Sequence, residues 1–125
     1  MKKGLNLVEL SLILLAVGVL IAVTLPRFMD LSNQVNINAA RGVLDDMRAA
    51  IAIQYANNSA RGIYPAFPPS IEASMFENAR IPVEPISNSN AVQVGSAEPA
   101  AVSRGWYYDR IRGRIFINNK NYASY

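Results

Sequence analysis

A single carboxylate interrupts the start of a long apolar run, and this arrangement limits the possible folds more than any other feature. Glu9 follows Leu7 and Val8, and the residues from Leu12 to Leu25 are almost wholly apolar. About 20 apolar residues in a helix cross the roughly 30 Å hydrocarbon layer of a membrane. A charged side chain inside such a span costs roughly 2.5–3.5 kcal/mol on insertion scales. Because the run contains no basic residue, we infer that a positive partner for Glu9 comes from elsewhere.

The residues on either side of the run indicate how it lies in a membrane. Lys2 and Lys3 precede it, which places the N-terminus on the cytoplasmic side and the rest of the chain in the periplasm or exterior. A secretory signal peptide has a shorter apolar stretch and a small-residue cleavage site, and residues 24–27 (Thr-Leu-Pro-Arg) offer none. An ordinary single-span anchor explains the length of the run but leaves Glu9 unexplained.

The sequence around Glu9 resembles the N-terminal signal of the type IV pilin and type II secretion pseudopilin superfamily. The likeness is carried by the leader Lys2-Lys3-Gly4, the stretch Leu5-Asn6-Leu7-Val8-Glu9-Leu10, and Gly18, Pro26 and Phe28. The chain departs from the family at Leu5, where phenylalanine is usual, and at Asn6, where threonine is usual. The resemblance covers about a quarter of the chain.

The resemblance implies roles for five residues. A prepilin peptidase would cut between Gly4 and Leu5, and the new N-terminal residue Leu5 would be methylated. Glu9 would then pair with the N-terminal amine of a neighbouring subunit. Gly18 and Pro26 bracket a stretch that can melt in filaments of this family, and an interior proline destabilises a helix by about 3 kcal/mol. We therefore expect helix flexibility there.

Past Pro26 the pattern becomes amphipathic and helical. Apolar residues recur at spacings of three and four, in the stripe Phe28, Leu31, Val35, Ala40, Val43, Leu44, Met47, Ile51 and Tyr55. This stripe predicts a helical face that packs on a sheet. Residues 57–62 are expected to end the helix, because Gly62 is able to take a left-handed conformation.

The remaining residues are expected to form a loop and then strands. Ser70 is a candidate cap for a short helix over residues 71–77, and residues 106–118 predict a hairpin. By the two-residue period of strands, Trp106 and Tyr108 are expected on one face, and Ile115 and Ile117 on another. The loop resembles the linking loop of pseudopilins at Tyr64, Pro65, Ile81, Pro82 and Pro85, and the hairpin resembles that of many minor pilins and pseudopilins.

Together these patterns predict an α+β, pilin-like fold in which a long N-terminal membrane-spanning helix packs on a small antiparallel β-sheet. The expected divisions are a leader peptide (1–4), a transmembrane and assembly helix (5–25), an amphipathic continuation of that helix (26–62), and a periplasmic loop with a C-terminal β-sheet (63–125).

Composition excludes several classes of chemistry. The chain has no cysteine and no histidine, so thiol nucleophiles, catalytic triads and zinc sites are not available. The acids Glu98 and Asp109, with nearby asparagines, make a poor calcium cage, and we expect no cofactor, no metal and no enzyme activity. Loss of Lys2 and Lys3 would leave ten basic and nine acidic residues, and this near-balance argues against nucleic acid as a partner.

The expected function is therefore structural: a subunit of a pilus-like filament, with a type II secretion pseudopilin as the first interpretation. The alternative is a type IV pilin or minor pilin in adhesion, motility or DNA uptake. The second alternative is a membrane-anchored binding module that does not polymerise. The resemblance implies copies of the same or related subunits, a prepilin peptidase and an inner-membrane assembly platform as partners. The expected location is the bacterial inner membrane, single-pass, and then a periplasmic or surface filament.

Overall fold

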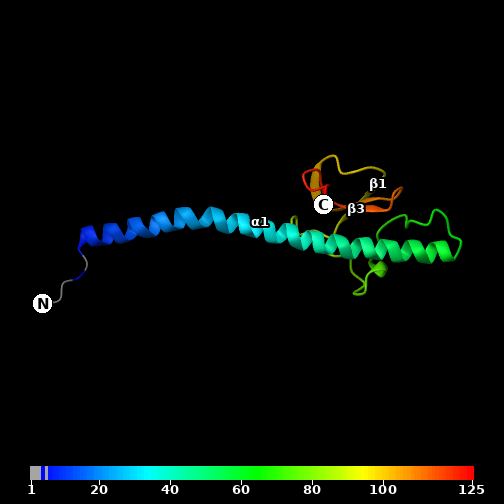
Figure 1. Cartoon of the computed structure of the whole chain (residues 1–125), viewed down its shortest axis with the longest axis horizontal. Helices are drawn as coiled ribbons and strands as arrows, with labels where there is room; N and C mark the ends of the chain where they lie inside the picture. The colour runs from blue at the N-terminus through cyan, green and yellow to red at the C-terminus, as the bar shows by residue number, and fades with distance from the viewer. Residues whose placement is uncertain (1–3, 5) are drawn as a thin grey trace. The chain divides into compact units, whose positions relative to one another are not determined.

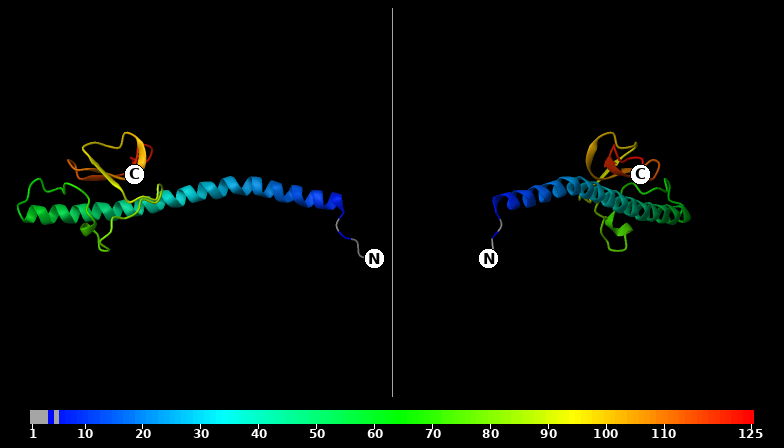
Figure 2. Two further views of the ribbon diagram at one scale, coloured as in Figure 1. Left: turned by 180° about the vertical axis from the view of Figure 1, so that it is seen from behind. Right: turned by 60° about the vertical axis from the view of Figure 1, so that its left-hand side comes forward.

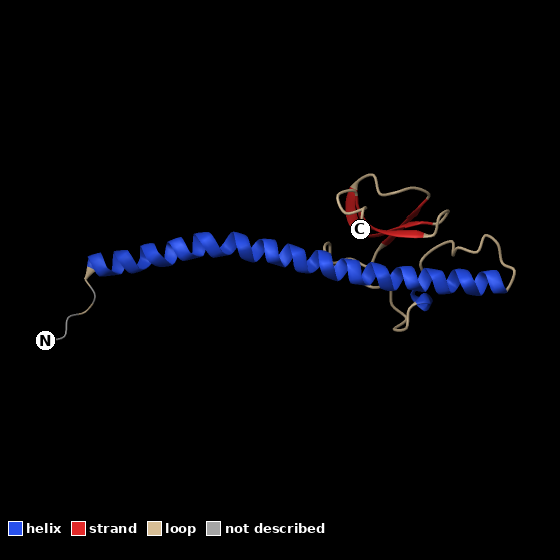
Figure 3. Cartoon of the chain, viewed as in Figure 1, coloured by secondary structure: helices blue, strands red, loops and turns tan. Residues whose placement is uncertain are grey.

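A long helix is the first element of the chain, and a small sheet is the last. The computed structural model describes Gly4 and residues 6–125, in which helix α1 spans Leu7–Ala60 and the strands follow it in sequence (Figures 1 and 3). The chain forms two compact units, Met1–Val35 and Asn36–Tyr125, and α1 contributes to both. Helix and strands are segregated along the chain, so the predicted α+β class is confirmed.

Helix α1 ends in a Schellman motif, which the predicted role of Gly62 anticipated. Gly62 has φ = 73°, its N–H donates to the Ser59 carbonyl at 3.1 Å, and the Ile63 N–H donates to the Asn58 carbonyl at 2.9 Å. These two bonds satisfy carbonyls that the last helical turn would otherwise leave open. Ala60 is the last residue of the helix, two residues before the expected boundary at 62.

The sheet has three strands in the order β1 (Val92–Gly95), β2 (Val102–Asp109) and β3 (Arg114–Asn119). The expectation of an antiparallel sheet is wrong for one pair, because β1 runs parallel to β2 while β2 and β3 are antiparallel. Gly95, the last residue of β1, lies beside Asp109, the last residue of β2. The connection 96–101 must therefore run back along the length of β2 to reach Val102, a distance of about 23 Å at 3.3 Å per residue. That distance requires an extended segment rather than a hairpin turn.

The core of the second unit forms between α1 and one face of the sheet (Figure 2). Its fully or nearly fully buried members are Ala40, Leu44, Met47, Ile51, Ile71, Trp106, Tyr108, Ile115 and Ile117. Trp106 pairs with Ile117, and Tyr108 pairs with Ile115. These pairs therefore share one face of the sheet, which corrects the expectation that they occupy two faces.

The apolar stripe of α1 changes its role along the helix. Its later residues, from Ala40 to Ile51, enter the core, whereas Phe28, Leu31 and Val35 remain exposed. The prediction that the whole stripe packs on a sheet is thus wrong for residues 28–35, and also for Tyr55, which is 41% exposed and contacts the Phe67 ring. Helical periodicity identifies an apolar face, but it does not say what covers that face.

Two core side chains fasten the long loop to the sheet. The Trp106 Nε1–H donates to the Pro82 carbonyl, and the Tyr108 hydroxyl donates to the Pro68 carbonyl, each at 2.7 Å. Burial raises the pKa of the Tyr108 hydroxyl from its ordinary value of 10.0 to about 12, and the neighbouring charge of Asp109 adds to the shift. Both bonds satisfy polar groups that would otherwise be costly to bury.

Two buried carboxylates hold turns in place. Asp109 accepts backbone N–H bonds from Ile111 (3.0 Å) and Arg112 (3.2 Å), and the Arg112 guanidinium lies 3.2 Å away. Burial alone would raise the pKa of Asp109, but these bonds outweigh it and hold the pKa below its usual value. Glu84 accepts the backbone N–H groups of Ile86 and Ser87, each at 2.7 Å.

The short helix that was expected over residues 71–77 is a single 3₁₀ turn, Ala73–Met75, and its N-cap is Glu72 rather than Ser70. Ile71 is buried in the core and Glu72 has an extended backbone, so the turn begins only at Ala73.

Gly105 lies within strand β2 and has φ = 77°. A Cβ there would collide with the Ala91 carbonyl, so only glycine fits where β2 meets the residue before β1.

Candidate functional site

The first unit presents an apolar surface that no described residue covers. Between Leu7 and Leu25 the large apolar side chains are all exposed, from 43% at Leu10 to 82% at Leu7. By length and composition, α1 contains a segment able to cross a membrane. Exposed apolar patches of this extent mark sites of contact with lipid or protein. We therefore expect this surface to contact lipid, protein or both.

Asn6 starts this helix, a role that the sequence analysis missed. Its side-chain Oδ1 accepts the Glu9 backbone N–H at 2.8 Å, and its carbonyl accepts the Leu10 N–H at 3.0 Å. Asparagine is among the best helix N-caps. The spacing Asn-x-x-Glu before an apolar run is close to the capping-box signature, so the sequence did carry a signal for this role. Asn6 thereby fixes the position of Glu9 in the first turn.

The Glu9 carboxylate has no hydrogen bond or ion pair with any residue that the structure describes, although its backbone N–H is bonded. Glu9 is exposed on the same surface as the apolar side chains. A carboxylate here is stabilised by the helix N-terminus, but it still lacks a cationic partner within the described chain. Pairing of Glu9 with the N-terminal amine of another subunit stays a prediction.

The predicted cleavage site is only partly described. Gly4 lies before the helix, and a Cβ added to it would meet nothing within 4 Å, so the fold itself does not require glycine there. Leu5, the residue predicted to be methylated, lies outside the described residues. Cleavage between Gly4 and Leu5 and methylation of Leu5 therefore stay predictions.

Gly18 and Pro26 both lie within continuous α-helix. A Cβ on Gly18 would meet nothing within 4 Å, and Pro26 lacks the N–H that would bond to the Ala22 carbonyl. Between them, the Thr24 hydroxyl donates to the Leu20 carbonyl at 2.8 Å, a back-bond that slightly weakens a helix. The helix is formed here, and its predicted flexibility stays a prediction.

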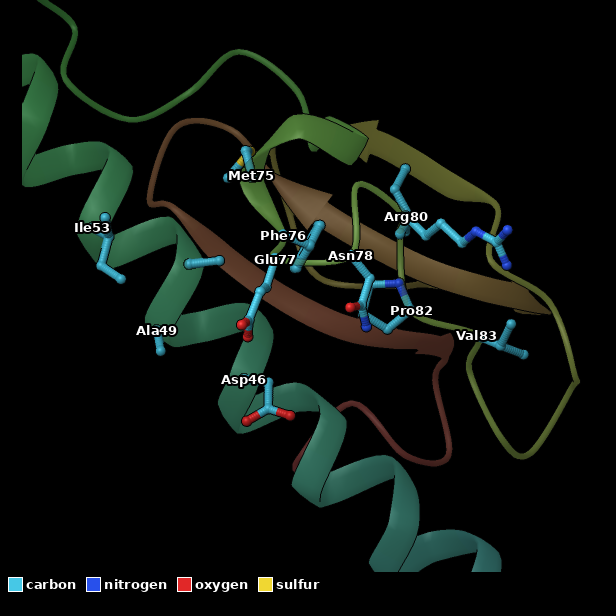
Figure 4. Close-up of a pocket in the computed structure, with 12 residues that line it drawn as sticks. Asp46, Ala49, Ile53, Met75, Phe76, Glu77, Asn78, Arg80, Pro82 and Val83 are labelled. Atoms are coloured by element: carbon cyan, nitrogen blue, oxygen red, sulfur yellow. The ribbon is translucent and has the colours of Figure 1, made fainter.

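The second unit carries a groove of about 650 Å³ between α1 and the segment 75–83 (Figure 4). Ala49, Ala50 and Ile53 form its helical wall, and Phe76 and Pro82 lie opposite. In Figure 4 the Glu77 side chain extends toward the helix that carries Asp46, whereas the Arg80 guanidinium points away from that helix.

Glu98 and Asp109, the two acids that the sequence suggested as calcium ligands, both lie in the second unit. The sequence offers no histidine or cysteine to the groove. Among the residues that the structure describes, no three His, Cys, Asp or Glu side chains gather where they could hold a metal ion. Asp109, considered above as a calcium ligand with Glu98, is instead bonded within its own turn.

Comparison with known proteins gives one informative match. No model of a known protein family matches the chain, and no solved structure matches it. A curated protein of Thermus thermophilus, described as "Type IV narrow pilus major component PilA5", is 38% identical over 61 residues. The match covers 49% of this chain and 51% of the relative, so the chain spans about half the length of the curated relative it matches. Over that half, the chain is similar to a type IV pilin.

Proposed function

We propose that this chain is a structural subunit of a type IV pilus-like filament. The observation that carries the proposal is the exposed apolar surface of α1 from Leu7 to Leu25, with the unpartnered Glu9 carboxylate at its start. The similarity to a type IV pilus major component supports the same function. A subunit of this kind acts by packing, which agrees with the contact surfaces described above.

The proposed assembly rests on the resemblance to the pilin and pseudopilin superfamily together with the apolar surface of the first unit. Residues 1–4 are removed as a leader, and residues 5–25 hold the subunit in the inner membrane with residues 63–125 in the periplasm. Residues 26–62 continue the helix beyond the membrane. After cleavage at Gly4 by a prepilin peptidase, the methylated amine of Leu5 on one copy pairs with Glu9 of another. An inner-membrane platform then moves subunits from lipid into a helix-to-helix bundle, in which protein replaces lipid against the apolar surface.

A type II secretion pseudopilin is the second candidate. Two features favour it: the chain has no cysteine with which to close a C-terminal loop, and the loop 64–85 resembles the linking loop of pseudopilins. The two candidates share the same subunit chemistry and differ in the machine that assembles it. Deleting the gene and measuring both surface pili and secreted protein would distinguish them, since each candidate predicts loss of one and not the other.

Substitution of Glu9 tests the assembly mechanism. In Glu9→Ala, a neighbour's amine is left buried and unpaired, a penalty of roughly 3–5 kcal/mol at each contact. We expect normal membrane insertion and processing but loss of filaments from the sheared fraction. Glu98→Ala, the same change at an exposed carboxylate outside α1, should assemble normally. Filaments of Glu9→Ala in normal amounts would refute the pairing and favour a non-polymerising anchor.

Processing is tested separately. We expect mass spectrometry of the wild-type protein to show a chain that starts at methylated Leu5. Gly4→Leu should accumulate as an uncut precursor, because an extended scissile segment leaves little room for a side chain. Gly42→Leu, at an exposed helical glycine with open space around it, should be processed normally. A wild-type chain that starts at Met1 or beyond Pro26 would contradict the assignment.

The flexibility of α1 is tested in the filament by amide exchange. We expect weaker protection over residues 19–25 than over residues 45–53, and replacement of both Gly18 and Pro26 by alanine should remove that difference, since glycine and proline cost about 1 and 3 kcal/mol relative to alanine in a helix. Equal protection of both stretches in the wild type would reject the idea.

A further inference from the structure

A second, chemically different pocket lies on the face of the sheet that points away from the core. It measures about 390 Å³ and lies between the sheet and the connection 97–101. Its polar lining comes from all three strands and from that connection: Gln93, Glu98, Ser103, Tyr107 and Asn118. This volume is within the range of roughly 300–1,000 Å³ typical of small-molecule sites.

The sequence builds this pocket by strand alternation. Trp106 and Tyr108 face the core, so Tyr107 between them faces the opposite side. Ile115 and Ile117 likewise direct Asn118 outward. The connection 96–101 is held against this face by Pro99, which is buried. The pocket is therefore a consequence of the parallel β1–β2 pair, because that pairing carries the connection back along the sheet.

Two contacts fix the pocket's side chains. The Tyr107 phenol lies directly over Gly95, where a Cβ would collide with it. The Asn118 Nδ2 group donates to Gln93 Oε1 at 3.1 Å and to the Arg104 carbonyl at 3.4 Å, which links β3 to β1 across β2. Asn118 is only 5% exposed, so its orientation is set by the protein and not by solvent.

Several polar groups of the lining have no partner in the described part of the chain. They are the Tyr107 hydroxyl, the Ser103 hydroxyl, the Glu98 carboxylate, the Gln93 amide nitrogen and the Asn118 amide oxygen. No buried side-chain nitrogen or oxygen in the described residues lacks a hydrogen bond, so these groups are accessible to solvent. The pocket thus offers both donors and acceptors beside an aromatic ring.

The charge of the lining selects among ligand classes. No lysine or arginine lines the pocket, and Glu98 is its one ionisable carboxyl group among the described residues. Phosphates, nucleotides and acidic sugars would meet a negative charge without a cation to offset it. A hydroxyl-rich neutral molecule fits, because each hydroxyl both donates and accepts while its C–H surface packs on the Tyr107 ring. We propose that this pocket binds a neutral sugar residue.

The proposal is independent of filament assembly and is tested on the full-length chain. The protein is kept in a polyoxyethylene detergent, because detergents with sugar headgroups would compete for the pocket. Glucose, galactose, mannose and N-acetylglucosamine are each titrated while the side-chain amide signals of Gln93 and Asn118 are followed by NMR. Glucuronic acid and glucose 6-phosphate serve as charged counterparts. We expect at least one neutral sugar to shift both amide signals and the charged sugars to shift neither.

Matched variants connect the binding to the pocket. Tyr107→Phe and Gln93→Ala should each weaken binding roughly tenfold, the effect of losing one good hydrogen bond. Tyr64→Phe, at an exposed tyrosine, and Ser96→Ala, at an exposed serine outside the pocket, should leave the affinity unchanged. The dispersion of the backbone amide signals shows in each case whether the variant is folded.

Any of three outcomes would overturn the proposal. The first is that no neutral sugar shifts the two amide signals in the folded wild-type protein. The second is that a charged sugar binds as well as a neutral one. The third is that Tyr107→Phe and Gln93→Ala bind as the wild type does. Should both variants fail to fold, the wild-type titration alone decides the result.

Discussion

Tyr108→Phe is the substitution for which the structure gives the most detailed expectation. The Tyr108 side chain is fully buried, and its hydroxyl donates to the Pro68 carbonyl at 2.7 Å. Phenylalanine keeps the ring and the packing but leaves that carbonyl without its donor. At neutral pH we expect the variant to be less stable than the wild type by about 1–2 kcal/mol, the usual penalty for one buried group left unpaired.

The pH dependence of this difference is the sharper test. The folded-state pKa of Tyr108 is about 12, above its ordinary value of 10.0, so the folded state holds the proton more tightly than the unfolded state does. The stability linked to Tyr108 is therefore complete below pH 10 and is lost as the pH rises through about 12, by about 3 kcal/mol in total. Phenylalanine cannot ionise, so Tyr108→Phe loses no stability through this group as the pH rises. The stability curves of the wild type and of Tyr108→Phe should cross at about pH 11.

Urea unfolding of the full-length chain in micelles measures both effects. Trp106 is the chain's single tryptophan, and it is fully buried in the same core, so its fluorescence reports the unfolding of this unit. Tyr64→Phe is the control, because Tyr64 is 74% exposed. A wild-type-to-variant difference that stays constant from pH 8 to pH 12 would show that Tyr108 does not behave as the structure indicates.

Three further substitutions test the turns and the core by the same unfolding assay. Asp109→Ala should destabilise the protein by about 2–3 kcal/mol at pH 7, since it leaves two backbone N–H groups without an acceptor. This loss should shrink as the pH falls through the lowered pKa of Asp109. The control Asp45→Ala, at a carboxylate that is 77% exposed, should change stability by less than about 1 kcal/mol. Gly105→Ala should destabilise the protein by at least about 2 kcal/mol, because φ is positive there and the added Cβ would collide with the Ala91 carbonyl. The control Gly42→Ala, in open space on the helix, should stabilise the protein by up to about 1 kcal/mol. Equal effects of the two substitutions would contradict the geometry. Leu44→Ala, in the fully buried core, should destabilise by about 2–5 kcal/mol, and a loss below about 1 kcal/mol would show that the core is not packed as described.

The local features of the chain were predictable because they depend on neighbouring residues. Gly62 ended the helix as expected, since a left-handed residue is needed at that position and glycine adopts it most easily. The apolar run from Leu12 to Leu25 predicted the exposed helical segment, and Glu9 lies on it without a described partner. The N-cap role of Asn6 was not predicted, although its spacing of three residues from Glu9 is close to the capping-box signature.

The topology of the sheet was not predictable from the same patterns. Alternation in β1, β2 and β3 is identical for parallel and antiparallel pairs, so nothing local indicated that β1 returns parallel to β2. The faces of Trp106 and Ile117 were assigned wrongly for a related reason. A period of two orders residues within a strand, but only the register between strands decides which of their faces coincide.

The sequence by itself thus determined the helix, its end, its apolar membrane-length segment and the place of the one carboxylate in that segment, because covalent neighbours and side-chain polarity specify these directly. The tertiary structure alone decided which part of the apolar stripe enters a core and which part stays exposed. It also decided that the connection 96–101 crosses the outer face of the sheet, where Gln93, Tyr107 and Asn118 line one pocket. These residues are far apart in sequence, and only the pairing of three strands brings them together.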